Sequence, residues 1–479
     1  MARSILKVLS DEEVQRIHET SLKILQEFGA KIDDEDLRND LVDLGCSVEG
    51  DRVKIPADVV EKVVENVKKH NHLTFTSRTG YTVEMNPDTT VTHTAGGLPD
   101  IIDLETGAKR RPLTEDFIAS MRLINQLEYP EFPCALVYPD DVPSQINQVK
   151  QVELMFRYSK KPIYSPGISS PGEAKFIASL FKAFEESYKD EIKNPMGNVC
   201  ISPESPLHIP QVITDTMKEI ISAGIATSIL SAPVGGMTGP LTLAGGLAQV
   251  NAEMIAFATV CYVINPETPL FYGSRLFYAN MKTGCTIMGL PETGLASAAA
   301  AQMAAYNGFL SDVFGLCNTS CTYDVQSGYE KAINGLVPAL AGASWISGFG
   351  SMASLMVASY EALVIDSEIF SLMKRVLDGI TVNDDTLGLD VLHSAIEGSM
   401  ILAHPHTIKH LRSGELFKPD LGFNSVWSDW VKDGSKDIQT VARERVRELI
   451  EKDEIVPLPD DLEKEVNEIM AEATKELVK

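Results

Sequence analysis

The stretch IATSILSAPVGGMTGPLTLAGGLAQVNAEMIAFATVCYVINPETPLFYGS, residues 225–274, decides the fold. It begins with a β-branched apolar run at 225–230, passes through a glycine-rich turn, and continues as a long apolar segment with a helical pattern at 243–264. A second strand-like run follows at 269–274. A strand, a helix and a strand in this order are typical of a βαβ unit with parallel strands.

The same alternation continues on both sides of this stretch. Strand-like runs are predicted at 133–138, 162–165, 197–202, 225–230, 269–274, 312–317, 339–347 and 361–368, with helical patterns between them. Eight strands alternating with helices favour an α/β protein with a (β/α)8 TIM barrel over one with an open sheet. No GxGxxG motif follows the first strand, which argues against a Rossmann fold.

The predicted elements divide the chain into three parts. Residues 1–110 are expected to form an N-terminal α/β subdomain, which starts with a helix over 10–30 capped by Ser10 and Glu13 and includes the strand-like run TVTHT. Residues 111–408 are expected to form the barrel. Residues 409–479 are helical and acidic, and we expect them to pack outside the barrel or to make a subunit contact.

Charge and composition exclude several classes of partner. The net charge is −25, with 67 acidic and 42 basic residues, so the surface repels nucleic acid and anionic membranes and suits a cationic ligand or a basic partner. No apolar stretch reaches about 18 residues without a polar break, and no membrane span is expected. Seven scattered cysteines and an N-terminus without a signal-peptide pattern predict a cytoplasmic protein.

The glycine-rich turn resembles a phosphate-binding loop only superficially. A P-loop needs its lysine, whereas no Lys or Arg occurs between Glu219 and Ser274. Gly235, Gly236 and Gly239 are instead predicted to keep the turn at the carboxyl end of a barrel strand free of side chains. The space would admit a substrate or the cofactor of a partner protein.

Active sites of TIM barrels lie at the carboxyl ends of the strands. The residues near the predicted strand ends are rich in aromatic and acidic side chains. Aromatic faces bind quaternary ammonium groups with roughly 0.5–2 kcal/mol per contact, and an arginine can bind a carboxylate. The alternatives are core or rim positions for the aromatic residues and an ion pair with Glu292 or another acid for Arg275. The candidates are Tyr138, Tyr164, Tyr272, Arg275, Trp345 and Phe349 for substrate binding, with Glu204, Asp324 and Glu292 as catalytic acids.

Histidines and cysteines give weaker signals. No histidine occurs between His208 and His393, so a His-ligated metal or a Ser–His–Asp triad within those strands is excluded. His404, His406 and His410 form one cluster, which is expected to cap a surface helix or, alternatively, to contact a cofactor brought by a partner. The spacing of Cys317 and Cys321 is a weak zinc signal, and no metal is expected.

Several separated blocks occur in the order found in one enzyme family. GGMTGPLTLAG, FYGSR followed by PET, QSGYEKAINGLVPALAGASWISGFG and ASYEALVIDSEI resemble the trimethylamine methyltransferase family of corrinoid-dependent enzymes. The resemblance implies a TIM barrel that transfers an N-methyl group to Co(I) of a corrinoid carried by a separate partner protein. It also implies a homo-oligomer.

The family has two branches, and this chain resembles the one without pyrrolysine. Members with pyrrolysine act on trimethylamine, and the residue is expected near the loop at 318–324, where this chain has none. The other branch resembles glycine betaine methyltransferases, which act on quaternary amines. Transfer of a methyl group from a quaternary ammonium releases a neutral amine and needs no general acid. The aromatic candidates would then surround the ammonium, the acids would favour its charge, and Arg275 would hold a carboxylate.

Two other functions stay open at this point. One is a TIM-barrel enzyme of another class, such as a lyase or a zinc hydrolase that uses the two cysteines. The other is a non-catalytic betaine-binding protein. Proline betaine, glycine betaine, carnitine and γ-butyrobetaine all carry an ammonium and a carboxylate, and the sequence does not distinguish between them.

Overall fold

Seven parallel strands form the central sheet of the protein, for which a computed structural model describes residues 5–479. Neighbouring strands in the order β6–β18–β17–β14–β12–β10–β9 all pair in parallel. The strands are β6 (Val91–Thr94), β9 (Ile163–Gly167), β10 (Gly197–Ile201), β12 (Thr227–Ser231), β14 (Leu270–Ser274), β17 (Leu310–Phe314) and β18 (Trp345–Phe349).

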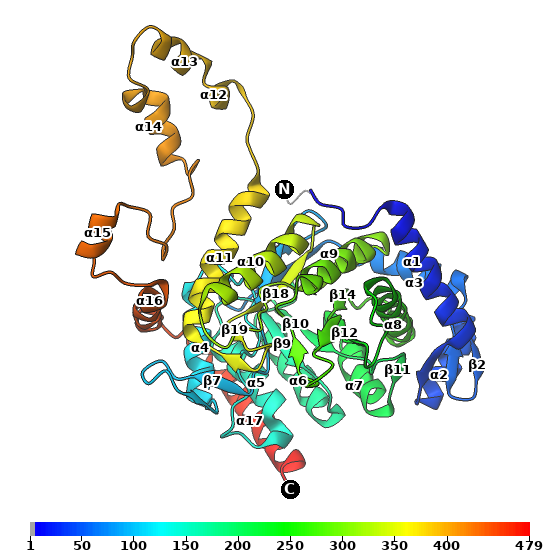
Figure 1. The fold of residues 1–479 in the computed structure, drawn as a ribbon. Coiled ribbons are helices and arrows are strands. Elements are labelled where there is room, and N and C mark those ends of the chain that lie inside the picture. The colour runs from blue at the N-terminus through cyan, green and yellow to red at the C-terminus, as the bar shows by residue number, and fades with distance from the viewer. Residues whose placement is uncertain (1–4) are drawn as a thin grey trace.

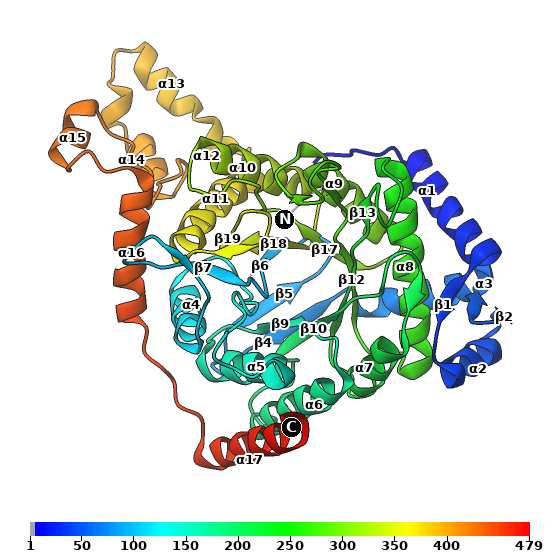
Figure 2. The same cartoon turned by 60° about the horizontal axis from the view of Figure 1, so that its bottom comes forward.

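Helices surround this sheet (Figures 1 and 2). They are α4 (Thr114–Gln126), α5 (Asn147–Tyr158), α6 (Pro171–Ser187), α7 (Gln211–Ser222), α8 (Leu243–Ile264), α9 (Pro291–Tyr306), α10 (Val325–Leu340) and α11 (Tyr360–Asp378). Strands and helices alternate along the chain from β9 to α11. The predicted TIM barrel is therefore confirmed.

Residues 132–137 bridge the two edges of the sheet. Phe132 pairs with His93 of β6, and Cys134 pairs with Tyr164 of β9, in each case in parallel. Pro133 lies between them and has no N–H to give to a ladder, so the segment forms isolated bridges where the sequence predicts a regular strand.

At the ends of the barrel, one predicted strand belongs to a different sheet from the one expected, and one predicted strand is wrong. The run TVTHT, assigned to the N-terminal subdomain, contains β6, which pairs with β18 in the barrel. The run at 361–368 lies inside helix α11, where residues 360–366 are all buried. Continuous burial gives a helix the same uninterrupted apolar pattern as a buried strand, so periodicity does not separate the two.

A β-hairpin closes the amino-terminal end of the barrel. It consists of β4 (Leu73–Thr76) and β5 (Thr82–Met85). Phe75 of this hairpin packs in one apolar cluster with residues at or near the starts of barrel strands, including Val91, Phe271 and Trp345. This end is therefore a packed core, and a ligand site must lie at the other end.

The N-terminal part packs against α8. Helix α1 (Asp11–Lys23) has the predicted capping box between Ser10 and Glu13. The remaining elements are α2 (Glu35–Leu44), α3 (Ala57–Val67) and the strands β1 (Ala30–Ile32), β2 (Ser47–Glu49) and β3 (Arg52–Lys54). Helices α1, α2 and α3 all contact α8. In residues 5–479, α8 is the one helix long and apolar enough to cross a membrane, and 83% of its most apolar window is buried in this packing.

Besides the β4–β5 hairpin, three small sheets lie outside the barrel sheet in the described residues. β7 (Asp100–Ile102), β8 (Lys109–Arg110), β19 (Ser351–Met352) and β20 (Val357–Ala358) form one of them. β13 (Val234–Gly235), β15 (Phe277–Ala279) and β16 (Thr286–Ile287) form the second. β11 (His208–Ile209) pairs with β1 and so joins the barrel to the N-terminal part.

The chain after α11 forms an arm that projects from the barrel (Figure 1). The arm comprises residues 380–436 and contains α12 (Asp384–Leu387), α13 (Leu389–Ile396), α14 (Pro405–Arg412) and α15 (Trp427–Lys432). The chain then returns to the barrel as α16 (Ile438–Lys452), which packs on α4 and α11, and α17 (Asp460–Leu477), which packs on α6.

Candidate active site

A cavity of about 610 Å³ lies at the carboxyl end of the barrel. Its deep end includes His93, Tyr164 and Arg275, which are each less than 10% exposed. Its rim includes Met356, which is 52% exposed. The cavity thus starts inside the barrel and opens toward solvent at the end where TIM-barrel active sites lie.

Asp312 organises the deep end of the cavity. It is the third residue of β17 and is completely buried. Its Oδ1 accepts a hydrogen bond of 2.5 Å from Nη2 of Arg275 and lies 3.2 Å from Nε2 of His93. Its Oδ2 accepts a hydrogen bond of 2.5 Å from the hydroxyl group of Tyr164. Four strands thereby position one network. His93, Tyr164 and Asp312 lie in β6, β9 and β17, and Arg275 directly follows β14.

The charges of this network follow from its contacts. Burial acts to raise the pKa of Asp312, but Arg275, His93 and the hydrogen bonds outweigh it and hold that pKa below its usual value. Burial, together with the nearby Asp312 carboxylate, raises the pKa of Tyr164 well above its usual value, so the phenol stays neutral. The two ring nitrogens of His93 lie 2.7 Å from Thr94 O and 3.2 Å from Asp312 Oδ1.

Of the predicted substrate-binding residues, Tyr138, Tyr164 and Arg275 line the cavity. Arg275 forms its ion pair with Asp312, at 2.5 Å, rather than with Glu292. Its guanidinium group also lies over the ring of Phe314, with 5.0 Å between them. Tyr164 stacks on His93 with ring centroids 4.1 Å apart.

The other three predicted aromatic residues do not line the cavity. Trp345 is the first residue of β18 and packs in the cluster that closes the opposite end; the sequence places the strand too early and so puts Trp345 near its carboxyl end. Tyr272 points to the helical layer, where its hydroxyl group donates to Asn251. Phe349 packs against Phe370 of α11.

The three predicted acids also lie away from the cavity. Glu204 is paired with His208, whose other ring nitrogen lies 3.1 Å from Asp33. Asp324 is the N-cap of α10 and accepts a hydrogen bond from the N–H of Ser327. Glu292 lies in the first turn of α9. Asp324 and Glu292 stand at helix starts, which favour acidic residues for a local reason, whereas Glu204 forms an isolated bridge with His208.

The predicted glycines form a tight turn beside the cavity without lining it. A Cβ atom on Gly235 would lie 2.4 Å from the ring of Tyr278, and one on Gly239 would lie 2.6 Å from Gln249. Gly236 has a φ of 85°, which side chains disfavour. The turn therefore needs glycine for close packing and for its backbone conformation.

Two glutamine side chains of the cavity lining, the half-buried Gln148 and the buried Gln151, have unpaired carbonyl oxygens. Nε2 of Gln148 donates to Gly167 O, and Nε2 of Gln151 donates to Asn147 Oδ1. Within residues 5–479 no protein donor reaches the buried Oε1 atom of either side chain. Because the amide groups are held through their nitrogens, each carbonyl oxygen remains as a buried acceptor with partial negative charge and no protein donor.

His93 and Asp312 are the functional residues that the sequence prediction missed. The prediction takes residues near the ends of the predicted strands, whereas Asp312 is the first residue of its predicted strand and His93 lies in the run assigned to the N-terminal subdomain. A charged or ionisable residue within an otherwise apolar strand is the signal that identifies them, because burial of such a group requires partners.

The cysteine and histidine clusters have different environments. Cys317 is buried, and burial raises the pKa of its thiol to about 12, while Cys321 is exposed. The pair therefore does not resemble a zinc site, whose thiolates must be deprotonated. His404 is the N-cap of α14 and accepts a hydrogen bond from the N–H of His406, which confirms the predicted capping role.

A barrel of parallel strands with a cavity at their carboxyl ends is the architecture of the TIM-barrel enzymes. The chain belongs to the trimethylamine methyltransferase (MTTB) family, whose model matches residues 2–478. It is therefore a methyltransferase.

Individual relatives cover nearly the whole chain. Trimethylamine methyltransferase MttB of Methanosarcina barkeri is 27% identical and aligns over 98% of this chain and 96% of its own. Glycine betaine methyltransferase of Desulfitobacterium hafniense (strain Y51) is 28% identical, with 89% and 88% coverage. A solved structure, monomethylamine methyltransferase of Methanosarcina barkeri, is 12% identical with a TM-score of 0.49 and covers 93% of this chain and 94% of that one.

Proposed function

We propose that the protein transfers an N-methyl group from a small quaternary amine of the betaine type to Co(I) of a corrinoid held by a partner protein. The observation that carries this proposal is the composition of the cavity. Its deep end holds Arg275 and His93, its lining also includes Tyr138 and two unpaired amide oxygens, and no Asp or Glu is among its described lining residues.

This composition suits a substrate with a carboxylate at one end and an ammonium at the other. Arg275 is the one Lys, Arg, Asp or Glu among the described lining residues of the cavity, so the deep end favours an anionic group. Arg275 has five N–H donors and makes three hydrogen bonds, to Ser274 O and to two oxygens of Asp312. Remaining donors are available for a substrate carboxylate.

The ammonium would then lie toward the rim. The ring of Tyr138 offers a π face, and Oε1 of Gln148 and Oε1 of Gln151 offer partial negative charge without requiring an N–H from the ligand. A trimethylammonium group has no N–H to donate and fits such surroundings. This orientation directs an N-methyl group toward the mouth, where the corrinoid of a partner would have to approach.

The proposed reaction needs little acid–base catalysis by the protein. Loss of a methyl group converts a quaternary ammonium into a neutral tertiary amine, so no proton has to be supplied to the leaving group. His93 is not free to supply one, because both its ring nitrogens are engaged. The residues contribute by binding, orienting and desolvating the ammonium.

The glycine turn would contribute to docking of the corrinoid protein. Met237 and Leu241 on this turn and the neighbouring Met281 are each at least 60% exposed. A Cβ atom on Gly236 would lie 3.3 Å from both Leu241 and Met281, so these side chains are close together. An apolar patch beside the cavity suits a corrin ring and its protein surface.

A substrate panel tests the proposed function. The protein, a reduced corrinoid protein or free Co(I) cobalamin, and each of proline betaine, glycine betaine, carnitine and γ-butyrobetaine are combined, and methyl-Co(III) is followed by its absorption. At least one of the four is expected to be demethylated in a protein-dependent reaction. Tight binding of a betaine without methyl transfer to either acceptor would favour a betaine-binding protein instead.

We further propose that the protein is a cytoplasmic homo-oligomer whose subunits meet through the arm. Ile380, Leu389, Ile396, Leu402 and Trp427 of the arm are each more than 70% exposed. A corrinoid protein must dissociate after every methyl transfer and therefore suits a less apolar surface. A permanent contact between subunits can bury a surface as apolar as this one.

The oligomeric state tests this proposal. Light scattering should give a multiple of the chain mass, and deletion of residues 380–436 should give the monomer. A monomeric full-length protein would contradict the proposal.

A further inference from the structure

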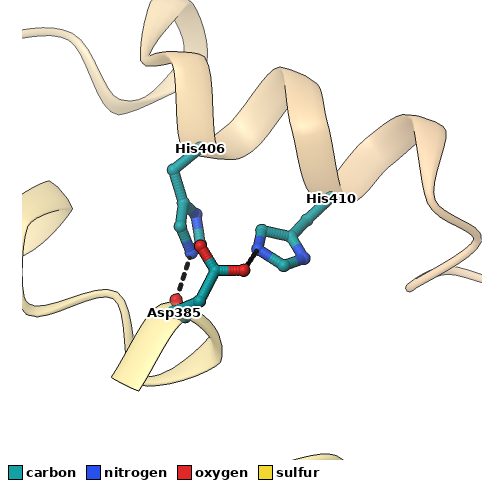
Figure 3. Close-up of side chains that lie close together, drawn as sticks. All are labelled: Asp385, His406 and His410. Carbon is teal, nitrogen blue, oxygen red and sulfur yellow. Dashed lines mark hydrogen bonds and ion pairs between the residues drawn. The ribbon is translucent and has the colours of Figure 1, made fainter. Parts of the chain in front are cut away.

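The arm carries a cluster of possible metal ligands that the methyl transfer does not use (Figure 3). Asp385 comes from α12, and His406 and His410 come from α14. One potential ligand atom from each residue lies within 4.8 Å of those from the other two. In the described residues, 5–479, this is the one group of three or more His, Cys, Asp or Glu side chains with that arrangement.

Helical spacing brings the two imidazoles together. His406 and His410 are four residues apart on α14, and their ring centroids are 4.2 Å apart. Figure 3 shows both rings on the side of α14 that faces Asp385. Nε2 of His410 lies 3.1 Å from Oδ2 of Asp385, and Nε2 of His406 lies 2.8 Å from the backbone oxygen of Asp385. The three side chains therefore converge on one small volume.

We propose that Asp385, His406 and His410 bind a divalent transition metal ion, with Zn²⁺ the best match. Two imidazole nitrogens and one carboxylate oxygen form a ligand set that suits Zn²⁺ in tetrahedral geometry. The fourth position would be filled by water or by His404, which lines the same cavity of about 600 Å³ as Asp385 and His406. None of the residues of this cavity lines the barrel cavity, so the ion is separate from the methyl-transfer site.

The arm has a structural use for such an ion. Among its residues 380–436, only Val391 and Leu421 are buried apolar side chains, so no hydrophobic core holds α12, α13 and α14 together. Small elements without a core commonly depend on a metal or a disulfide. An ion held by α12 and α14 links segments about twenty residues apart along the chain, and it would order the arm for its subunit contact.

Lys409 gives the proposal a distinctive test. Its Nζ lies 2.7 Å from Oδ2 of Asp385. The ammonium group therefore pairs with the same carboxylate that would coordinate the metal ion. A metal ion must displace this ammonium group and bind near its charge. Removal of the Lys409 charge should therefore strengthen metal binding, whereas it should leave binding unchanged if the ion is held elsewhere on the chain.

The experiment uses the full-length protein, treated with a chelator and dialysed. Zn²⁺ is added and measured by calorimetry, and Co²⁺ is added as a second probe because tetrahedral coordination gives strong visible absorption. One ion per chain is expected. His406→Ala and His410→Ala should each weaken binding by at least about tenfold, and Lys409→Met should strengthen it about threefold to fivefold.

The matched control is His393→Ala. His393 is an exposed histidine on α13 of the same arm and lies outside the cluster. The His393→Ala variant should bind Zn²⁺ with unchanged affinity. Zn²⁺ should slow tryptic cleavage after Arg412 in this variant but not in His406→Ala. Unchanged metal binding in the double variant His406→Ala/His410→Ala, or weaker binding in Lys409→Met, would overturn the proposal.

Discussion

Replacing Asp312 by asparagine is expected to lower the free energy of unfolding by about 3–5 kcal/mol, the usual cost of removing one partner from a buried ion pair. The carboxylate accepts from Arg275, His93 and Tyr164, and all four side chains are buried. The variant leaves the Arg275 guanidinium group in the barrel without its counterion. Urea unfolding followed by circular dichroism measures the change.

A matched control and a pH series separate this effect from loss of one hydrogen bond. Asp324→Asn changes an exposed helix cap and should cost about 1 kcal/mol or less. The pKa of Asp312 is held below its usual value, so its stabilisation is complete above the unfolded pKa of about 4 and declines only as the pH falls further. The difference from wild type should be constant between about pH 6 and 8 and shrink below about pH 4.

The double variant Asp312→Asn/Arg275→Gln removes both charges together. It should recover a large part of the stability that the single change loses, because the uncompensated cation is gone. If the single variant does not fold, the double variant still tests the pairing. A double variant that is less stable than Asp312→Asn by the full additive amount would contradict the account of the network.

Replacing Arg275 by glutamine is expected to raise KM for a betaine substrate by about 10- to 100-fold, which corresponds to loss of about 1.5–3 kcal/mol in charge-assisted hydrogen bonds. The same change should alter KM for tetramethylammonium by less than about threefold, because that cation has no carboxylate for Arg275 to bind. Initial rates of methyl-Co(III) formation with each compound measure the split.

The comparison between two substrates is its own control for structural damage. A collapsed cavity would impair both compounds alike, whereas loss of a carboxylate contact impairs only the betaine. Tyr272→Phe, which changes a hydroxyl group in the helical layer outside the cavity, should leave both KM values unchanged. Equal increases for betaine and tetramethylammonium in Arg275→Gln would remove the carboxylate role of this residue.

The barrel is predictable from sequence because its inner strands alternate regularly with helices along the chain. Strands such as β12 and β14 begin and end within two residues of their predicted positions, since glycine and proline mark their ends. The two ends of the barrel are less predictable. β6 is short and polar and resembles a hairpin strand, and α11 is buried almost all round its first two turns and resembles a strand.

The site is predictable only in part because its geometry depends on which face of a strand a residue occupies. Tyr164 and Tyr272 look alike in sequence, yet one points into the barrel and the other points toward the helices. Asp312 is the first residue of the predicted strand at 312–317, and the prediction takes its candidates from the other end of each strand. The pairing of Asp312 with His93 joins residues 219 positions apart, which no local pattern records.

The rate of methyl-Co(III) formation with a quaternary amine, compared with that from neutral trimethylamine, tests the central claim most directly. Both compounds are supplied to the same protein and the same Co(I) corrinoid at saturating concentration and at a pH where part of the trimethylamine is unprotonated. Because a betaine releases a neutral tertiary amine, whereas neutral trimethylamine would have to leave as an amide anion, a betaine is expected to react at least about 100-fold faster than trimethylamine. An equal or faster rate with trimethylamine, or no methyl-Co(III) with any of the four betaines, would contradict the account.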